Sequence, residues 1–207
     1  MIRPRLIVIT DARLAAPRPL RDVVQLALQG GARMIQLRDK RASARELCAQ
    51  ALALLPRVHG QGGWLIINDR TDVALAAGAD GVHLGPDDLP VAAARRITPP
   101  GFIIGASTDD PQRARELAAE GASYIGCGAV FGTSSKDVGG EQIGPGRVAE
   151  VTRAVGIPVV AVGGITPENV AQLRGSGAAG IAVVSAVMSS PDPAAAVRRL
   201  LRSFAAS

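Results

Sequence analysis

The chain alternates between short apolar runs and longer segments of helical composition, and it does so eight times. The apolar runs predict strands at Leu6–Thr10, Met34–Arg38, Leu65–Asn68, Gly81–Leu84, Phe102–Ala106, Tyr124–Cys127, Val159–Val162 and Ile181–Val184. The segments between them predict helices at Leu20–Gln29, Ala44–Val58, Thr71–Ala77, Pro90–Ile97, Pro111–Glu120, Pro145–Val155, Pro167–Arg174 and Pro193–Phe204. Such alternation is typical of a parallel sheet covered by helices.

A glycine signal marks the ends of several predicted helices. Gly followed at once by small residues and a strand occurs at 30–32, 78–80, 121–123 and 177–179. Glycine favours the left-handed conformation that ends a helix and turns the chain. With a repeat of about 25 residues, this predicts an α/β fold: a single-domain (β/α)8 TIM barrel over residues 1–207. An open doubly wound sheet is the alternative, but Thr10–Arg13 lacks the Gly-rich turn that would follow its first strand.

Composition narrows the class of partner. Apolar residues make up 47% of the chain and aromatic residues 2%, so Val, Ile, Leu and Ala must fill the core. The formal net charge is +5. A basic chain with so few aromatic side chains lacks stacking platforms, so we expect no nucleic-acid partner. The charge suits small phosphorylated substrates equally well.

The location of the protein follows from what the sequence lacks. No apolar run reaches about 18 residues, so we expect no membrane association. Met1–Thr10 has a strand pattern rather than that of a signal peptide, which predicts a cytoplasmic protein. Cys48 and Cys127 are interpreted as small buried hydrophobic residues. The sequence leaves open whether the chain forms a homo-oligomer.

The barrel places chemistry at the carboxyl ends of its strands. Side chains alternate along the second strand, so Ile35 and Leu37 can face the helices. Gln36 and Arg38 would then lie inside the barrel, with Lys40 at its mouth. A buried arginine needs a partner, either in an internal ion pair or in a bound anion. The cluster of amide, guanidinium and ammonium groups favours the anion site.

Lysine use supports that interpretation. Lys40 and Lys136 are the two lysines in a chain with 23 lysine and arginine residues together. Both follow predicted strands. Lysine offers a compact point charge on a flexible stem, which suits a phosphate oxygen. The loop that holds Lys136 is rich in hydroxyl groups and glycine and is expected to act as a mobile lid.

Two carboxylates follow the third and fourth predicted strands. Asp69 and Asp88 lie in adjacent loops, beside the expected phosphate site. Magnesium takes oxygen ligands and binds phosphate, so we expect this pair to hold Mg²⁺. Capping of the next helix by Asp87 or Asp88 is the alternative. His83 is expected inside the barrel, hydrogen-bonded rather than acting as a base.

The remaining strand ends offer hydroxyl groups and glycines. Ser107 ends the fifth strand and can donate to a phosphate oxygen, while Gly163–Ile165 and Val184–Ala186 follow the seventh and eighth strands. Loops seven and eight form the usual phosphate site of such barrels. We therefore expect a diphosphate-and-metal site from loops two to six and a monophosphate site from loops seven and eight.

Together these motifs resemble the thiamine phosphate synthase family. The resemblance rests on segments in the family's order over nearly the whole chain: Gln36–Lys40, Asn68–Asp69, Ala79–Gly85 with Asp88, Thr133–Lys136 and Gly163–Ile165. It implies a transferase of thiamine biosynthesis. The family joins hydroxymethylpyrimidine diphosphate to carboxythiazole phosphate, giving thiamine phosphate, diphosphate and carbon dioxide through a pyrimidine cation.

The resemblance also implies roles for individual residues. Residues implied to bind the pyrimidine diphosphate are Gln36, Arg38, Lys40, Asn68, Ser107 and Lys136, of which Lys40, Ser107 and Lys136 are the catalytic candidates. Asp69 and Asp88 would bind Mg²⁺. Residues implied to bind the thiazole phosphate are Thr133, Ser134, Ser135, Gly164, Val184 and Ser185.

Three positions depart from the family pattern. Ser135 replaces a usual Thr and keeps its hydroxyl, so we expect a small effect. Ala129 stands where the family usually has Pro, which we expect to loosen the loop. Asp109 stands where His or Thr is common, and because a carboxylate would repel a diphosphate, we expect it to cap the next helix.

Three rival functions fit parts of the same sequence. The related thiazole tautomerase, an isomerase on the same barrel, has His at the position of Ala129 and lacks equivalents of Lys40 and Asp88, so the synthase is favoured. A non-catalytic phosphate-binding barrel would not need the carboxylate pair together with both lysines. An aldolase would normally carry its Schiff-base lysine within a strand, where burial lowers the pKa. Both lysines of this chain lie beyond the ends of predicted strands, which disfavours that function.

Overall fold

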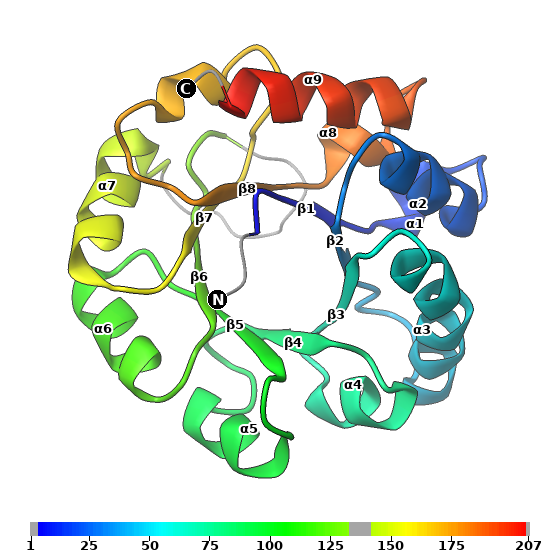
Figure 1. The fold of residues 1–207 in the computed structure, drawn as a ribbon, viewed down its shortest axis with the longest axis horizontal. Coiled ribbons are helices and arrows are strands. Elements are labelled where there is room, and N and C mark those ends of the chain that lie inside the picture. The colour runs from blue at the N-terminus through cyan, green and yellow to red at the C-terminus, as the bar shows by residue number, and fades with distance from the viewer. Residues whose placement is uncertain (1–3, 133–141, 206–207) are drawn as a thin grey trace.

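The described residues form a closed barrel of eight parallel strands. A computed structural model describes residues 4–132 and 142–205. The strands are β1 Leu6–Ile9, β2 Met34–Leu37, β3 Trp64–Asn68, β4 Gly81–Leu84, β5 Ile103–Ser107, β6 Tyr124–Cys127, β7 Val159–Val162 and β8 Gly180–Val183. Each strand pairs with its neighbour in sequence, and β8 pairs with β1 to close the ring (Figure 1). The predicted (β/α)8 TIM barrel is confirmed.

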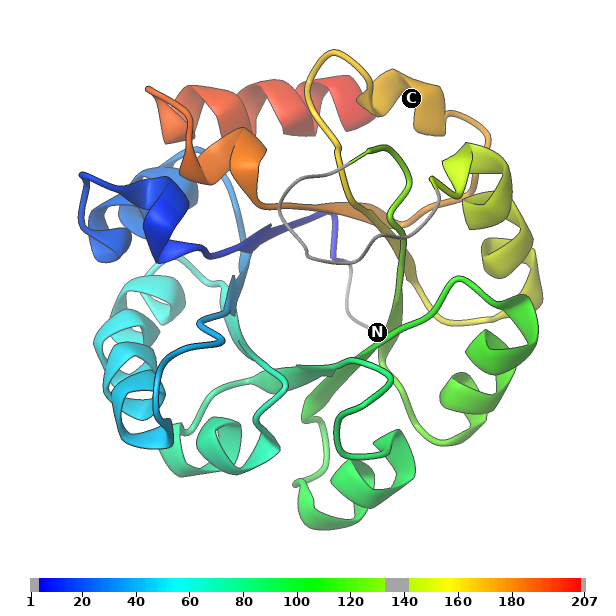
Figure 2. The same cartoon turned by 180° about the vertical axis from the view of Figure 1, so that it is seen from behind.

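Helices surround the ring of strands. They are α1 Ala12–Ala15, α2 Leu20–Gln29, α3 Ala44–His59, α4 Thr71–Ala77, α5 Val91–Ile97, α6 Pro111–Ala119, α7 Gly144–Ala154, α8 Ser185–Met188 and α9 Pro193–Ala205, with a 3-10 turn η1 at Val170–Leu173. Seen from either end of the barrel, they lie outside the strands (Figures 1 and 2). Among the described residues, no helix is both long and apolar enough to cross a membrane.

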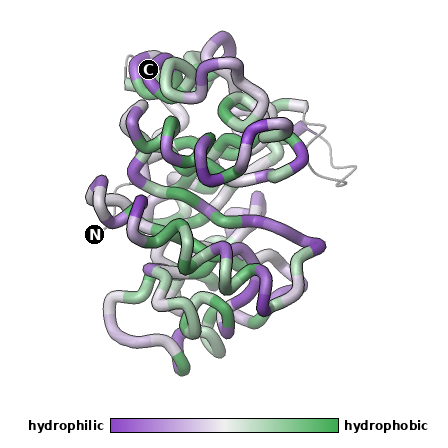
Figure 3. Tube along the Cα trace, turned by 90° about the vertical axis from the view of Figure 1, so that its right-hand side faces the viewer, coloured by the Kyte–Doolittle hydropathy of each residue, from purple (hydrophilic) through white to green (hydrophobic). Residues whose placement is uncertain are grey.

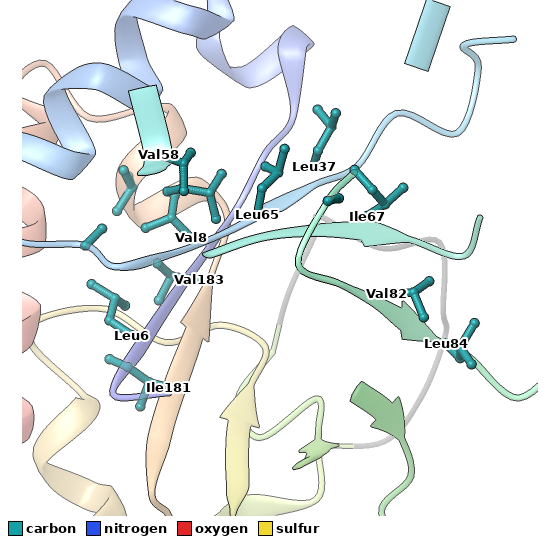
Figure 4. Packing of buried hydrophobic residues seen from close by; sticks show 14 of the residues in the cluster. Leu6, Val8, Leu37, Val58, Leu65, Ile67, Val82, Leu84, Ile181 and Val183 are labelled. Atoms are coloured by element: carbon teal, nitrogen blue, oxygen red, sulfur yellow. The ribbon is translucent and has the colours of Figure 1, made fainter. Parts of the chain in front are cut away.

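Most of the hydrophobic core lies between the strands and the helices. Outward-facing residues such as Val8, Leu37 and Leu65 are fully buried there, and Val58 of α3 lies beside Val8 (Figure 4). Hydrophobic residues run along the inner part of the molecule, while hydrophilic residues lie mainly on helix exteriors and loops (Figure 3). The aliphatic core expected from the composition is therefore present.

A second, smaller core fills the inside of the barrel. It consists of Ile7, Ile9, Met34, Ile66, Ile103, Tyr124, Val160 and Ala182. These inward positions alternate with the outward ones along each strand. The same alternation turns Gln36 inward, between Ile35 and Leu37 of the outer core, as predicted. The inside of the barrel is thus packed with side chains, and Gln36 is a buried polar residue among them.

All eight predicted strands and seven of the eight predicted helices form, with shifts of at most one residue at their ends. The predicted helix Pro167–Arg174 is wrong, because only the short turn η1 forms there. The Asn169 side chain accepts a hydrogen bond from Thr166 N at 2.8 Å and donates one to Gly164 O at 2.8 Å. These bonds favour a turn over a regular helix. The short helices α1 and α8 lack a long enough apolar repeat to have been predicted.

Candidate active site

Strand β2 carries positive charge to the mouth of the barrel. The backbone N–H of Arg38 donates to Thr10 Oγ1 at 2.9 Å, which holds the end of β2 against the end of β1. Lys40 follows in the turn before α3, with 63% of its side chain exposed, and its Nζ lies 3.9 Å from Asp69 Oδ2. Lys40 therefore lies at the mouth, as the sequence predicted, with its charge open to solvent on one side.

Asp69 adopts a conformation that non-glycine residues rarely take. Its φ is 64°, the only positive value among the described residues other than glycine. Its N–H donates to His83 O at 2.8 Å, which ties the end of β3 to β4. Left-handed backbone at a polar residue is common where structure is over-determined around a functional group. The carboxylate of this residue lies beside Lys40.

The two predicted metal ligands lie together. Burial raises the pKa of Asp69 to about 6, and a hydrogen bond with Asp88 and the negative charge of Asp88 add to that rise. Lys40 and Arg38 oppose the rise, which places all four charged groups in one cluster. Two carboxylates brought together in a partly buried site offer the oxygen ligands that a hard divalent cation takes.

Asp88 does not cap the following helix. Its Oδ2 accepts a hydrogen bond from Gly85 N at 2.7 Å, which folds the loop after β4. The residue before α5 is Pro90, and no side chain caps that helix end. The alternative in which Asp87 or Asp88 serves as the N-cap is therefore wrong. The second carboxylate oxygen of Asp88 takes no part in that loop hydrogen bond.

The polar residues inside the barrel form a hydrogen-bonded group. His83 of β4 contacts Ser107 of β5 and Tyr124 of β6, and the Gln36 side chain also hydrogen-bonds to Tyr124. Gln36 is 3% exposed. His83 is thus a hydrogen-bonded interior histidine, as expected, and Gln36 lies deeper than a residue of the open mouth. Asn68 ends β3 in register with His83.

Glycines shape the loop after β7. Gly163 and Gly164 have φ values of 101° and 63°. A Cβ on Gly164 would lie 2.3 Å from Gly132 O, and one on Gly163 would lie 2.6 Å from Ala129 Cα. The loops after β6 and β7 are therefore packed backbone to backbone. Ala129 is also held through its carbonyl, which accepts from Ile143 N at 3.0 Å.

Other predicted residues fall into two groups. Ser185 begins α8 directly after Val184, at the end of β8. Thr133, Ser134, Ser135 and Lys136 lie outside the described residues, as does the expected lid. On either side of that segment, Gly132 lies close to Gln142, since a Cβ on Gly132 would meet the Gln142 amide nitrogen at 2.7 Å.

Asp109 does not cap the next helix, and that prediction is wrong. The N-cap of α6 is Asp110, whose side chain accepts from Gln112 N at 2.9 Å. Sequence alone could not separate two adjacent aspartates before Pro111. The negative charge of Asp109 instead contributes to a raised pKa of Cys127, for which burial is the main cause and which reaches about 12. Cys127 is buried, while Cys48 is half-buried.

Sequence reasoning missed Tyr124 and Gly105. Tyr124 is the one tyrosine of the chain, and it begins a strand whose inward positions are otherwise small. An isolated aromatic residue facing into a barrel was the available signal. Within the described residues, no group of three or more His, Cys, Asp or Glu side chains could hold a metal ion. A cation at Asp69 and Asp88 would therefore complete its shell with water and phosphate oxygens.

Comparisons with known proteins point to one family. The family model described as "Thiamine monophosphate synthase" matches residues 6–187. A thiamine-phosphate synthase from Chlorobium luteolum is 52% identical over 198 residues, which cover 96% of this chain and 92% of that protein. One from Roseiflexus castenholzii is 50% identical and covers 93% of this chain and 85% of that protein.

A solved structure agrees with both sequence comparisons. Thiamine phosphate pyrophosphorylase from Pyrococcus furiosus superposes with a TM-score of 0.89 at 39% identity, covering 99% of this chain and 96% of that one. A 3-hexulose-6-phosphate synthase, 19% identical with a TM-score of 0.69, shares the fold alone. Likeness of sequence and of fold thus coincide in one group of proteins.

Proposed function

The chain belongs to the thiamine monophosphate synthase family, and from this premise we propose how its residues carry out the reaction. It is a transferase of thiamine biosynthesis that joins hydroxymethylpyrimidine diphosphate to carboxythiazole phosphate. The products are thiamine phosphate, diphosphate and carbon dioxide. The observation that carries the assignment of the site is the charged cluster of Arg38, Lys40, Asp69 and Asp88 at the mouth of the barrel.

The pyrimidine diphosphate binds over β2 to β5. Arg38 and Lys40 supply positive charge beside the leaving diphosphate, and Lys136 supplies a second ammonium group from the segment outside the described residues. Asn68 and Ser107 offer hydrogen bonds from the ends of β3 and β5. Gln36 supports this layer from below through its hydrogen bond to Tyr124. Preorganised charge at the leaving group is the term that dominates such catalysis.

Asp69 and Asp88 would hold Mg²⁺. Their donor set fits a hard cation, because both offer carboxylate oxygens and because burial and the charge of Asp88 raise the pKa of Asp69. When bound, the ion supplies charge neutralisation for the departing diphosphate. Lys40, 3.9 Å from Asp69, keeps this side of the mouth from becoming purely negative.

The thiazole phosphate binds on the opposite side, over β6 to β8. Gly164 brings backbone close to the loop after β6, and Ser185 offers a hydroxyl group at the end of β8. Thr133, Ser134 and Ser135 contribute hydroxyl groups from the neighbouring segment, and Val184 lines the floor. The two substrates then meet above the barrel interior, with their phosphate groups apart.

The reaction proceeds by loss of diphosphate before the new bond forms. The aminopyrimidine stabilises the methylene cation, and the thiazole nitrogen attacks it. The chain needs no nucleophile of its own for this sequence. Consistent with that, burial raises the pKa of the Cys127 thiol to about 12, so the thiolate is not available at neutral pH.

A coupling assay tests the proposal. Purified protein is mixed with pyrimidine diphosphate, carboxythiazole phosphate and magnesium, and thiamine phosphate is followed by fluorescence after oxidation. We expect product that disappears with a chelator and returns with added magnesium. Product that persists in chelator would remove the metal from the proposal. No product from a folded protein would favour a tautomerase-like isomerase or a non-catalytic phosphate-binding barrel.

A further inference from the structure

Three polar side chains from consecutive strands form a chain of hydrogen bonds inside the barrel. The Nδ1 atom of His83 lies 2.9 Å from the hydroxyl oxygen of Tyr124, and its Nε2 atom lies 2.8 Å from Ser107 Oγ. Tyr124 is 1% exposed, and the two rings lie at a tilt of 33°. His83 therefore connects the fully buried phenol to the hydroxyl group at the end of β5.

Two glycines make room for this chain. His83, Gly105 and Tyr124 lie side by side in the strand register. A Cβ on Gly105 would lie 2.2 Å from Tyr124 Cζ and 2.5 Å from His83 Nδ1. A Cβ on Gly126 would lie 3.0 Å from His83 Cε1. Any larger residue at Gly105 would occupy the space in which imidazole and phenol meet, so the contact is built into the sheet.

The direction of the hydrogen bonds in this group is set at Tyr124. Burial raises the pKa of Tyr124 well above its usual value, so its hydroxyl stays protonated and must donate to an acceptor. The Gln36 side chain hydrogen-bonds to the same hydroxyl, and in the arrangement proposed below its amide N–H donates to the oxygen. Tyr124 is then left to donate its proton to His83 Nδ1.

That order sets the tautomer of His83 and the role of Ser107. When Nδ1 accepts, the proton of a neutral imidazole is on Nε2, and Nε2–H donates to Ser107 Oγ. A hydroxyl group that accepts in this way still has its own proton to donate. Ser107 therefore presents a donor toward the mouth of the barrel. Phosphate oxygens only accept, so a donor at this place matches a diphosphate.

We propose that Tyr124 and His83 are positioning residues that orient Ser107 as a hydrogen-bond donor to the diphosphate-bearing substrate. The inference rests on the proposed function for the place of that substrate. If the Gln36 amide were reversed, every bond in the chain would reverse with it. Ser107 would then donate to His83 and present only an acceptor, which a diphosphate would not favour.

The tautomer can be measured without any substrate. The chain has two histidines, so nitrogen-15 spectra of imidazole-labelled protein contain two ring systems, and His59→Gln assigns the one that remains. His59 pairs with Asp80 on the surface, away from Ser107. We expect His83 to carry its proton on Nε2 and Tyr124→Phe to shift the population toward Nδ1–H. A dominant Nδ1–H form in the unsubstituted protein would overturn the proposal.

Kinetics then test whether the chain acts through Ser107. Tyr124→Phe removes only the hydroxyl group, and we expect KM for the pyrimidine diphosphate to rise about tenfold with a smaller change in kcat. In a Ser107→Ala background the same substitution should change KM less than twofold, since the group being oriented is gone. Equal effects in both backgrounds would mean a purely structural role and would overturn the proposal.

Two controls keep this result separate from other failures. His83→Gln retains an N–H donor near the Nε2 position, so its KM should rise less than that of His83→Ala. An equal rise in both variants would count against the proposal. Thermal unfolding of each variant checks that it is folded. An unsubstituted protein without synthase activity would refute the proposed function, whereas the tautomer measurement stands by itself.

Discussion

The mouth of the barrel and its interior both contain polar residues, but these residues are charged at the mouth and hydrogen-bonded to one another in the interior. At the mouth, Lys40, Asp69 and Asp88 lie together and remain partly exposed, and Asp88 adds to the raised pKa of Asp69 while Lys40 opposes it. In the interior, His83 and Tyr124 are hydrogen-bonded in a space cleared by glycine. The mouth holds the charged groups that we propose to bind an ion, while the interior groups bond to one another. Activity should therefore depend most on the mouth and rigidity most on the interior.

The largest effect on activity should come from Lys40→Ala, which removes a positive charge from the mouth. Loss of one preorganised charge at a leaving group lowers kcat by about 10²–10³-fold. The fold should be unaffected, because 63% of the Lys40 side chain is exposed. Steady-state kinetics of the coupling reaction give the measurement. Arg41→Ala, an adjacent cation, is the matched control and should remain near normal; equal loss in both would mean a general effect of charge.

Gly105→Ala should break the interior instead. Its Cβ would lie 2.2 Å from the ring of a buried tyrosine, so Tyr124 or the strand must move. Overpacking of this kind costs about 1–3 kcal/mol of the free energy of unfolding, measured by chemical denaturation. Gly146→Ala in α7 is the control, because nothing lies within 4 Å of its Cβ and alanine favours a helix. An unchanged stability in Gly105→Ala would show that the interior is loosely packed.

A smaller, pH-dependent effect should sharpen the description of the mouth. The pKa of Asp69 is about 6 in the folded chain against an ordinary 3.8, so the folded state holds this proton more tightly. Its stabilising contribution is complete below pH 4 and is lost as the pH rises through about 6. Asp69→Asn, neutral throughout, should therefore gain a few degrees of melting temperature over the metal-free parent across that window and keep the gain above it.

Magnesium should reverse that advantage. A cation that binds only the folded parent raises its melting temperature with concentration, whereas Asp69→Asn should respond weakly. The same variant should lose turnover. If the melting temperatures of parent and variant changed in parallel from pH 4 to 8 without metal, the raised pKa of Asp69 would be contradicted.

The barrel was predictable because its signals are local and repeated. A short apolar run such as that of β2 begins each unit, and glycine follows four of the predicted helices, as in Gly78–Asp80. The turn at Val170–Leu173 was not predictable, because its conformation depends on the Asn169 side chain competing for the backbone. Nor could the sequence choose between Asp109 and Asp110 as the cap of α6, since the two differ only in how the loop folds.

The site was predictable in its types of residue more than in its connections. Strand ends identified the meeting of Lys40, Asp69 and Asp88 because parallel strands bring their carboxyl ends together. The contact between His83 and Tyr124 depends on register across Gly105, which links residues 41 positions apart. A glycine that makes room for its neighbours cannot be told from any other glycine in a single sequence. The contact between His83 and Tyr124 is therefore evident only in the structure.

The scarcity of aromatic residues gives the molecule two separate optical reporters. The one tryptophan, Trp64, begins β3 and packs against the inner core, while the one tyrosine, Tyr124, lies beneath the candidate active site. Tryptophan emission therefore reports on the start of β3. Ultraviolet absorbance of ionised phenol appears in mild alkali only after the barrel opens, because burial holds the Tyr124 pKa far above normal. A single titration followed at two wavelengths would show whether the surroundings of β3 and of β6 come apart together.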